Sequence, residues 1–129
     1  MSLPQILTAR AVAQTCLDKW DKLGVVAGER ACMYDYENGH GCAIGLSLNA
    51  EVLQAVHRFG VNGEPVQFLQ ERRLINAGQD DLAALITLQS SHDFMISQQR
   101  YKKYSIITLQ DFRMLCEYLA SGGTLAETP

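Results

Sequence analysis

Apolar residues recur at steps of three and four residues through most of this chain, and that spacing is typical of α-helices that bury one face. One such stripe consists of Val52, Leu53 and Val56. A chain with this pattern over most of its length can fold only into a mainly helical structure. The pattern predicts about five helices, over residues 4–23, 50–59, 65 to about 76, 80–97 and 108 to about 122.

Residues that favour helix ends support these segments. Asn49 and Thr108 stand where a side chain can accept a hydrogen bond from the first turn of a helix, and Asp111 stands at the third position of a capping box. Gly24 and Gly60 follow the last apolar residue of their segments, where glycine commonly ends a helix.

Residues 31–46 do not follow the helical spacing. Two short apolar and aromatic runs flank Asn38-Gly39, and this arrangement is a strong indicator of a β-hairpin because a type I′ turn needs positive φ at both central residues. We therefore expect a hairpin over about residues 31–46. The whole chain, 1–129, is predicted to be one mainly helical α+β domain with its helices around that hairpin and a terminal tail over about 122–129.

The net charge and the lack of long apolar runs argue against two classes of protein, nucleic-acid binders and membrane proteins. The net charge is −3, whereas nucleic-acid binders usually carry a basic excess, so nucleic acid is a disfavoured partner. No apolar run approaches the ~20 residues that cross a bilayer, and the first residues lack a charged segment followed by an apolar one. We expect a cytoplasmic protein without a membrane partner, and a homo-oligomer stays an open alternative.

Residues 32–45 could in principle hold a metal. Cys32, His40 and Cys42 are of the right type, but zinc sites usually contain close cysteine pairs and a fourth ligand, and neither stands nearby. In the expected hairpin the two cysteines also point to opposite faces. We therefore predict no metal and no cofactor, and we expect Cys32 and Cys42 to be reduced, unbridged and largely buried. Gly41, opposite Tyr36 in the expected hairpin, would let an aromatic ring lie flat across it, and Gly45 would end the strand.

Two stretches of the sequence form a recognisable pattern, which consists of Cys32, Tyr34, Gly39, Cys42, Ala43, Ile44, Gly45, Leu88, Gln89, His92 and Asp93. On these residues the chain resembles a group of small, uncharacterised proteins of phages and prophage-bearing bacteria. The resemblance covers roughly residues 30 to 120, apart from residues 46–78, where this chain departs from the group. It implies a phage or mobile-element context, and it implies no activity.

His92 and Asp93 permit two interpretations. In the first, a buried His92 bonds to the backbone of the hairpin and Asp93 holds its ring, since buried polar groups normally have partners. In the second, Cys42, His92 and Asp93 form the centre of a small hydrolase or metal-dependent enzyme. We favour the first interpretation, which leaves no catalytic residue.

Residues 100–104, a basic and aromatic segment, are the candidate binding surface. Tyrosines alternate with basic residues there, and such segments bind acidic or nucleic-acid partners. The sequence therefore favours a non-enzymatic, phage-associated protein that binds a macromolecule, preferably a protein, and inhibits a host defence or regulatory component. The candidate binding residues are Arg100, Tyr101, Lys102, Lys103 and Tyr104.

Overall fold

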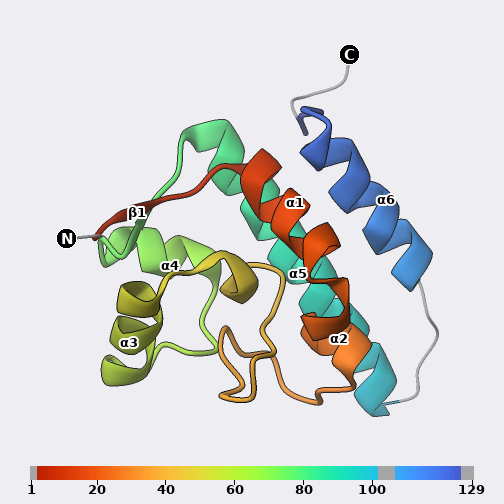
Figure 1. Cartoon of the computed structure of the whole chain (residues 1–129), viewed down its shortest axis with the longest axis horizontal. Coiled ribbons are helices and arrows are strands. Elements are labelled where there is room, and N and C mark those ends of the chain that lie inside the picture. Colours follow the sequence, from red (N-terminus) through yellow and green to blue (C-terminus); the bar gives the residue numbers. More distant parts are fainter. Residues whose placement is uncertain (1–2, 102–106, 126–129) are drawn as a thin grey trace.

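Helices form most of the computed structural model, which describes residues 3–101 and 107–125 (Figure 1). The long helices contribute many of the buried apolar side chains, and two short 3₁₀ turns and two short strands lie between them. The helices are α1 (Ala9–Asp18), α2 (Gly24–Ala27), α3 (Ala50–Arg58), α4 (Val66–Glu71), α5 (Gln79–Tyr101) and α6 (Leu109–Ala120); the 3₁₀ turns are η1 (Trp20–Lys22) and η2 (Gly45–Ser47); the strands are β1 (Gln5–Ile6) and β2 (Ile75–Asn76).

The 23-residue helix α5 runs through the molecule and packs against α1, α2, α4 and α6. α1 and α6 lie side by side, while α3 and α4 lie at the other end of the molecule (Figure 1). Leu85, Leu88 and Ile96 of α5 are almost fully buried. Burial of one large aliphatic side chain stabilises a fold by roughly 1.5–3 kcal/mol, so α5 supplies much of the core energy.

Several predicted helices are confirmed. α3 begins after Asn49, whose side chain accepts a hydrogen bond from the Val52 N–H at 2.9 Å. α6 begins after Thr108, and Thr108 and Asp111 form both hydrogen bonds of the capping box, each 3.0 Å long. α5 starts close to the predicted position and extends to Tyr101.

The first predicted helix, over residues 4–23, is wrong at both ends. Residues 5 and 6 form β1, because the Gln5 N–H donates to the Leu74 carbonyl at 3.0 Å in a parallel pair with β2. α1 begins only after Thr8, whose hydroxyl accepts from the Ala11 N–H. Gly24 does not end a helix but begins α2.

The predicted helix over residues 65–76 is shorter than expected. α4 ends at Glu71, and Arg73 has a φ of 59°, which interrupts helical geometry. The chain then enters β2, whose partner strand is some 70 residues earlier in the sequence.

The predicted hairpin is also wrong, although the chain does reverse near Asn38. Gly41 forms an isolated parallel bridge with Leu23, because its N–H donates to the Lys22 carbonyl and its carbonyl accepts from the Gly24 N–H. Tyr34 donates its N–H to Asn62. Two backbone hydrogen bonds do join the two runs, from the Tyr36 N–H to the His40 carbonyl at 3.2 Å and from the Cys42 N–H to the Met33 carbonyl at 3.1 Å, but the long-range partners interrupt the ladder that a hairpin needs. The fold class is therefore mainly helical α+β with a two-stranded parallel sheet and no hairpin among the described residues.

Across residues 3–101 and 107–125, no helix combines the length and the apolar character that crossing a membrane requires.

Candidate functional site

The two stretches that carry the family resemblance meet in the core. Tyr34 is almost completely buried, and its hydroxyl accepts a hydrogen bond from the Gln89 amide of α5 at 2.9 Å. The Cys32 thiol faces the Asp93 carbonyl at 3.9 Å. Residues separated by more than 50 positions in the sequence therefore act as one packed unit.

The lack of side chains at Gly41 and Gly45 allows the Tyr34 backbone to lie very close to the backbone of these two glycines. A Cβ atom on Gly45 would lie 1.9 Å from the Tyr34 carbonyl oxygen, and one on Gly41 would lie 2.7 Å from the same atom. The sequence predicted that Gly41 lets the ring of Tyr36 lie across a hairpin and that Gly45 ends a strand. In the structure the Tyr34 backbone lies against both glycines instead.

Gln89 satisfies several buried polar groups at once. Its carbonyl oxygen accepts from the Val66 N–H at 2.6 Å, and its amide donates to the Glu64 carbonyl at 3.2 Å as well as to Tyr34. Burial raises the pKa of the Tyr34 phenol, so the hydroxyl stays protonated and donates to Glu64. This network joins the loop after Tyr34 to the start of α4 and to α5.

His92 is fully buried in the same region. Its Nε2 accepts a hydrogen bond from the Val25 N–H at 3.0 Å, and its Nδ1 lies 3.3 Å from the Asp93 carboxylate. The ring proton is therefore on Nδ1, where Asp93 accepts it. The predicted burial and the predicted pairing with Asp93 are both present, but the backbone that His92 holds belongs to α2 and not to a hairpin.

The cysteines form no disulfide. Cys42 is buried, and burial raises the pKa of its thiol to about 12. Cys16 and Cys116 are buried on α1 and α6. The hydrogen bond that the Cys16 thiol makes with Cys116 raises the pKa of Cys16, and burial raises it further. A thiol reacts as its thiolate, so these buried cysteines are inert packing residues. Cys32 is only half-buried, which corrects the expectation that it is largely buried.

This difference in exposure predicts the order of thiol labelling. We expect iodoacetamide to modify Cys32 first in the native protein, and Cys16, Cys42 and Cys116 only after unfolding in urea, because the last three are buried. Intact-mass measurement before and after urea counts the adducts. Rapid native labelling of all four thiols, or the mass of a disulfide, would contradict this arrangement.

Two histidine–carboxylate pairs hold the loop that precedes Gly41. His40 Nδ1 lies 2.7 Å from Glu29, and His57 Nε2 lies 2.9 Å from Asp35. Hydrogen bonds from Asn38 and His40 lower the pKa of Glu29. Burial of Asp35 acts to raise its pKa, but hydrogen bonds from His57 and from the backbone outweigh this, so its pKa is also lowered.

These lowered pKa values predict a loss of stability in acid. A carboxyl group whose pKa is lower in the folded state stabilises the fold above its unfolded pKa, and this contribution disappears as pH falls through the folded value. We expect the urea midpoint to decrease below about pH 4.5, close to the ordinary pKa values of Glu29 and Asp35. The double variant Glu29→Gln, Asp35→Asn should show a smaller decrease between pH 5 and pH 3. An equal decrease in both proteins would show that the pairs contribute nothing.

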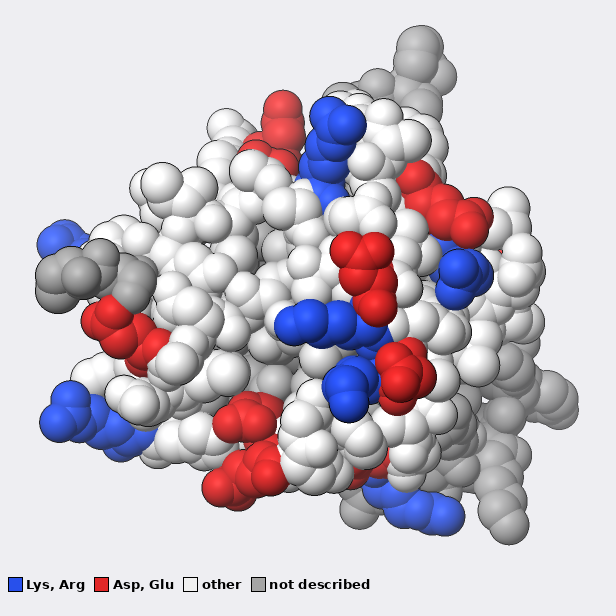
Figure 2. Space-filling view, viewed as in Figure 1, with Lys and Arg blue, Asp and Glu red and all other residues white. Residues whose placement is uncertain are grey.

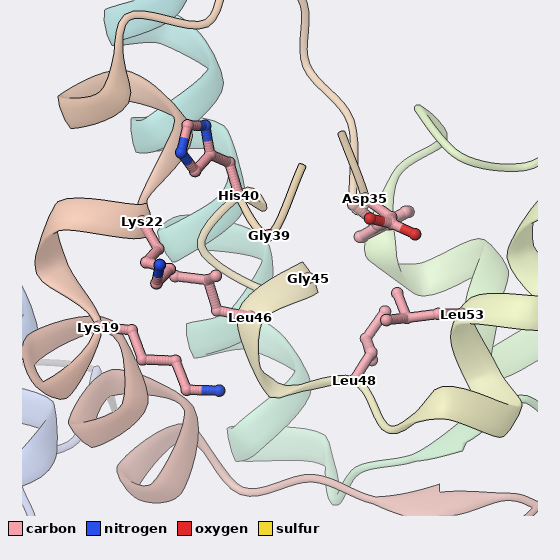
Figure 3. Close-up of a pocket in the computed structure, with 10 residues that line it drawn as sticks. Lys19, Lys22, Asp35, Gly39, His40, Gly45, Leu46, Leu48 and Leu53 are labelled. Carbon is pink, nitrogen blue, oxygen red and sulfur yellow. The ribbon is translucent and has the colours of Figure 1, made fainter. Parts of the chain in front are cut away.

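A surface cavity of about 370 Å³ lies beside this loop (Figure 3). Lys19 and Lys22 line one side, Asp35 and Leu53 line the other, and a leucine-rich wall completes it. Tyr34 and Gly45 of the packed unit also line this cavity. The lining residues are Lys19, Lys22, Tyr34, Asp35, Gly39, His40, Gly45, Leu46, Leu48 and Leu53.

Comparison of the chain with protein-family models, with curated proteins and with solved structures finds no match. The resemblance to phage proteins therefore stays a prediction.

The predicted site residues divide into three groups. Tyr34, Cys42, Gly45 and His92 are buried, while Cys32 and Asp93 are half-buried beside them. Gly39 lies at the exposed turn and has a φ of 89°. The candidate binding segment falls outside the described side chains: Arg100 and Tyr101 belong to the backbone of α5, and Lys102, Lys103 and Tyr104 lie outside the described residues.

Sequence reasoning missed Lys19 and Lys22. They stood in a segment predicted to be a continuous helix, where two lysines near the end suggest only a solvated surface. Among the described residues, no three His, Cys, Asp or Glu side chains converge as metal ligands would.

Proposed function

We propose that this chain is a non-enzymatic binding protein whose partner is another protein. One observation carries the proposal: the residues most suited to chemistry are used inside the fold, while an accessible cavity opens beside them, lined by two lysines that form no ion pair with any described residue. Concave sites with a few charged groups on an apolar surface are where proteins most often bind ligands.

The alternative, a hydrolase that uses Cys42, His92 and Asp93, has no observation in its favour. A nucleophile needs access to substrate and a base that can accept its proton. Cys42 is buried, and the Nε2 of His92 already accepts a hydrogen bond from Val25. The geometry supports a structural role for these three residues.

The surface charge favours a protein partner over nucleic acid. On the face shown in Figure 2, Lys and Arg side chains stand next to Asp and Glu, and a broad area carries no charge. Together with the net charge of −3, this pattern lacks the basic surface that neutralises phosphates. The resemblance to phage proteins supports a host defence or regulatory protein in the bacterial cytoplasm as the partner.

Affinity capture followed by reconstitution tests the proposal. The tagged full-length chain is used to capture proteins from a bacterial host, and each captured protein is then purified and mixed with the chain. We expect one of them to form a complex of fixed stoichiometry by light scattering, and we expect the variant Cys42→Ala to bind it equally well. Light scattering of the chain alone also shows whether it self-associates.

The opposite outcome is equally clear. The wild-type chain would then turn over a substrate from a panel of esters, peptides and phosphates, and it would form no stoichiometric protein complex. The folded variant Cys42→Ala or Asp93→Asn would lose this turnover. Such a result would replace the proposal with the hydrolase alternative.

A further inference from the structure

We infer that the cavity beside η1 binds a short acidic segment of a protein partner, with a carboxylate at Lys19 and Lys22 and a neighbouring apolar side chain on the leucine wall. The inference rests on the proposed function and names the site and the chemistry of recognition. Charge, shape and apolar surface each support it from separate observations.

The two lysines converge because of the local backbone. Lys19 immediately precedes η1 and Lys22 is its last residue, and the Lys22 N–H donates to the Lys19 carbonyl at 2.8 Å. This turn places both lysine side chains on the same side of the cavity (Figure 3). Neither lysine has an ion pair among the described residues, so both ammonium groups are available to an incoming anion.

Asp35 on the opposite wall makes that end of the cavity negative, while the lysines make the other end positive. Asp35 accepts hydrogen bonds from His57 and from the Glu37 N–H, each 2.9 Å long, so its charge is held in place and its pKa is lowered. It faces the cavity from the side away from the lysines (Figure 3). An anion is therefore repelled at one end and attracted at the other.

The remaining wall is apolar. Leu46 and Leu48 come from η2 and the residue after it, and Leu53 comes from α3. Leu46 and Leu53 are half-buried, so part of their surface stays available to a ligand. An exposed ion pair contributes little to affinity, so apolar contact with the leucines must supply much of it.

The number of charges selects the class of ligand. Two lysines in the lining match one or two carboxylates. Asp18 and Asp21 stand next to them in the sequence, so this region has no basic excess that could hold a polyanion such as nucleic acid. A cavity of about 370 Å³ is at the lower end of the range for ligand sites and accommodates a few side chains. A second hollow of about 450 Å³ on α3 carries both Glu51 and Arg58, and so shows no preference for an anion.

Amide chemical shifts of the ¹⁵N-labelled full chain test the inference directly. The probe is the peptide acetyl-Leu-Asp-Leu-amide, with acetyl-Leu-Asn-Leu-amide, acetyl-Gly-Asp-Gly-amide and sodium acetate as matched controls. We expect the probe to shift amides in residues 19–22, 39–40 and 45–48, and each control to shift them at least fivefold less at the same concentration.

Charge-removal variants then identify the lysines. Lys19→Gln and Lys22→Gln should each raise the Kd of the probe about fivefold, which is the upper range for one exposed ion pair. Arg10→Gln removes a positive charge from the same helical region, but Arg10 precedes Lys19 by nine residues, or about 13 Å of helix, so it should leave the Kd unchanged.

Each result decides one question. Equal shifts with the Asp and Asn peptides, or with acetate alone, would overturn the inference because the cavity would then recognise no acidic peptide. If the full chain still forms a stoichiometric protein complex, only the cavity assignment falls. If the probe binds as expected but no protein partner exists, the proposed function falls.

Discussion

The variant Gly45→Ala should lose most of the stability of this protein. The added Cβ would lie 1.9 Å from the Tyr34 carbonyl oxygen and 2.6 Å from its carbonyl carbon. Both atoms are backbone, so no side-chain rotation can relieve the collision, and the loop must move away from the core. We expect a decrease of more than about 3 kcal/mol in the free energy of unfolding, measured by urea denaturation.

Two further glycines serve as graded controls. A Cβ on Gly41 meets the same oxygen at 2.7 Å, so Gly41→Ala should cost less than Gly45→Ala but remain clearly destabilising. The nearest atom to a Cβ on Gly78 is 3.7 Å away, an ordinary contact, so Gly78→Ala should cost about 1 kcal/mol or less. If Gly45→Ala does not fold, the order of the other two variants still tests the argument. Equal stability of all three would show that the Tyr34 backbone does not lie where the structure places it.

The helices that the sequence predicted well are those defined by local interactions. Asn49 and Thr108 bond to amides three residues later, so their signals are complete within a single helical turn. The apolar spacing of α5 and α6 likewise needs no knowledge of the rest of the chain. Local patterns are therefore sufficient to predict these helices, although not the ends of α5.

The elements that were predicted wrongly depend on distant partners. β1 pairs with β2 across some 70 residues, and nothing in the short runs around Gln5 or Ile75 indicates that register. The chain reverses near Asn38, as Asn38-Gly39 indicated, but positive φ occurs at Glu37 and Gly39 rather than at Asn38 and Gly39. Two backbone hydrogen bonds join the flanking runs, from Tyr36 to His40 and from Cys42 to Met33, while other groups of these runs bond to Lys22, Gly24 and Asn62. The local sequence therefore indicated the reversal, but neither the turn type nor the long-range partners.

The same distinction applies to the candidate site. His92, Asp93 and Gln89 were noted from the sequence because they form a recognisable pattern, and they occupy the core unit. The cavity was missed because it exists only where η1 meets the loop before α3. Lys19 and Leu53 are 34 positions apart, and no periodicity connects them.

The variant His92→Ala should be the second most damaging single change. It removes the acceptor that the structure gives to the Val25 N–H, and it leaves a space where a fully buried ring packs near Phe112. Loss of a hydrogen bond in the core costs about 1–3 kcal/mol, and the lost packing of the ring adds to it. We expect a decrease of about 3 kcal/mol in the free energy of unfolding, measured in urea at pH 7.

Conservative variants separate a structural role from a chemical one. In His92→Gln the side-chain carbonyl can reach the position of Nε2 and accept from Val25, so part of the stability should return. Asp93→Asn should cost less than about 1 kcal/mol, because the carboxylate lies 3.3 Å from Nδ1 and is partly exposed. Binding of the protein partner should survive in all three variants at a temperature where each is folded. A stable His92→Ala protein that no longer binds would instead place His92 at the functional surface, with Asp93 orienting its ring.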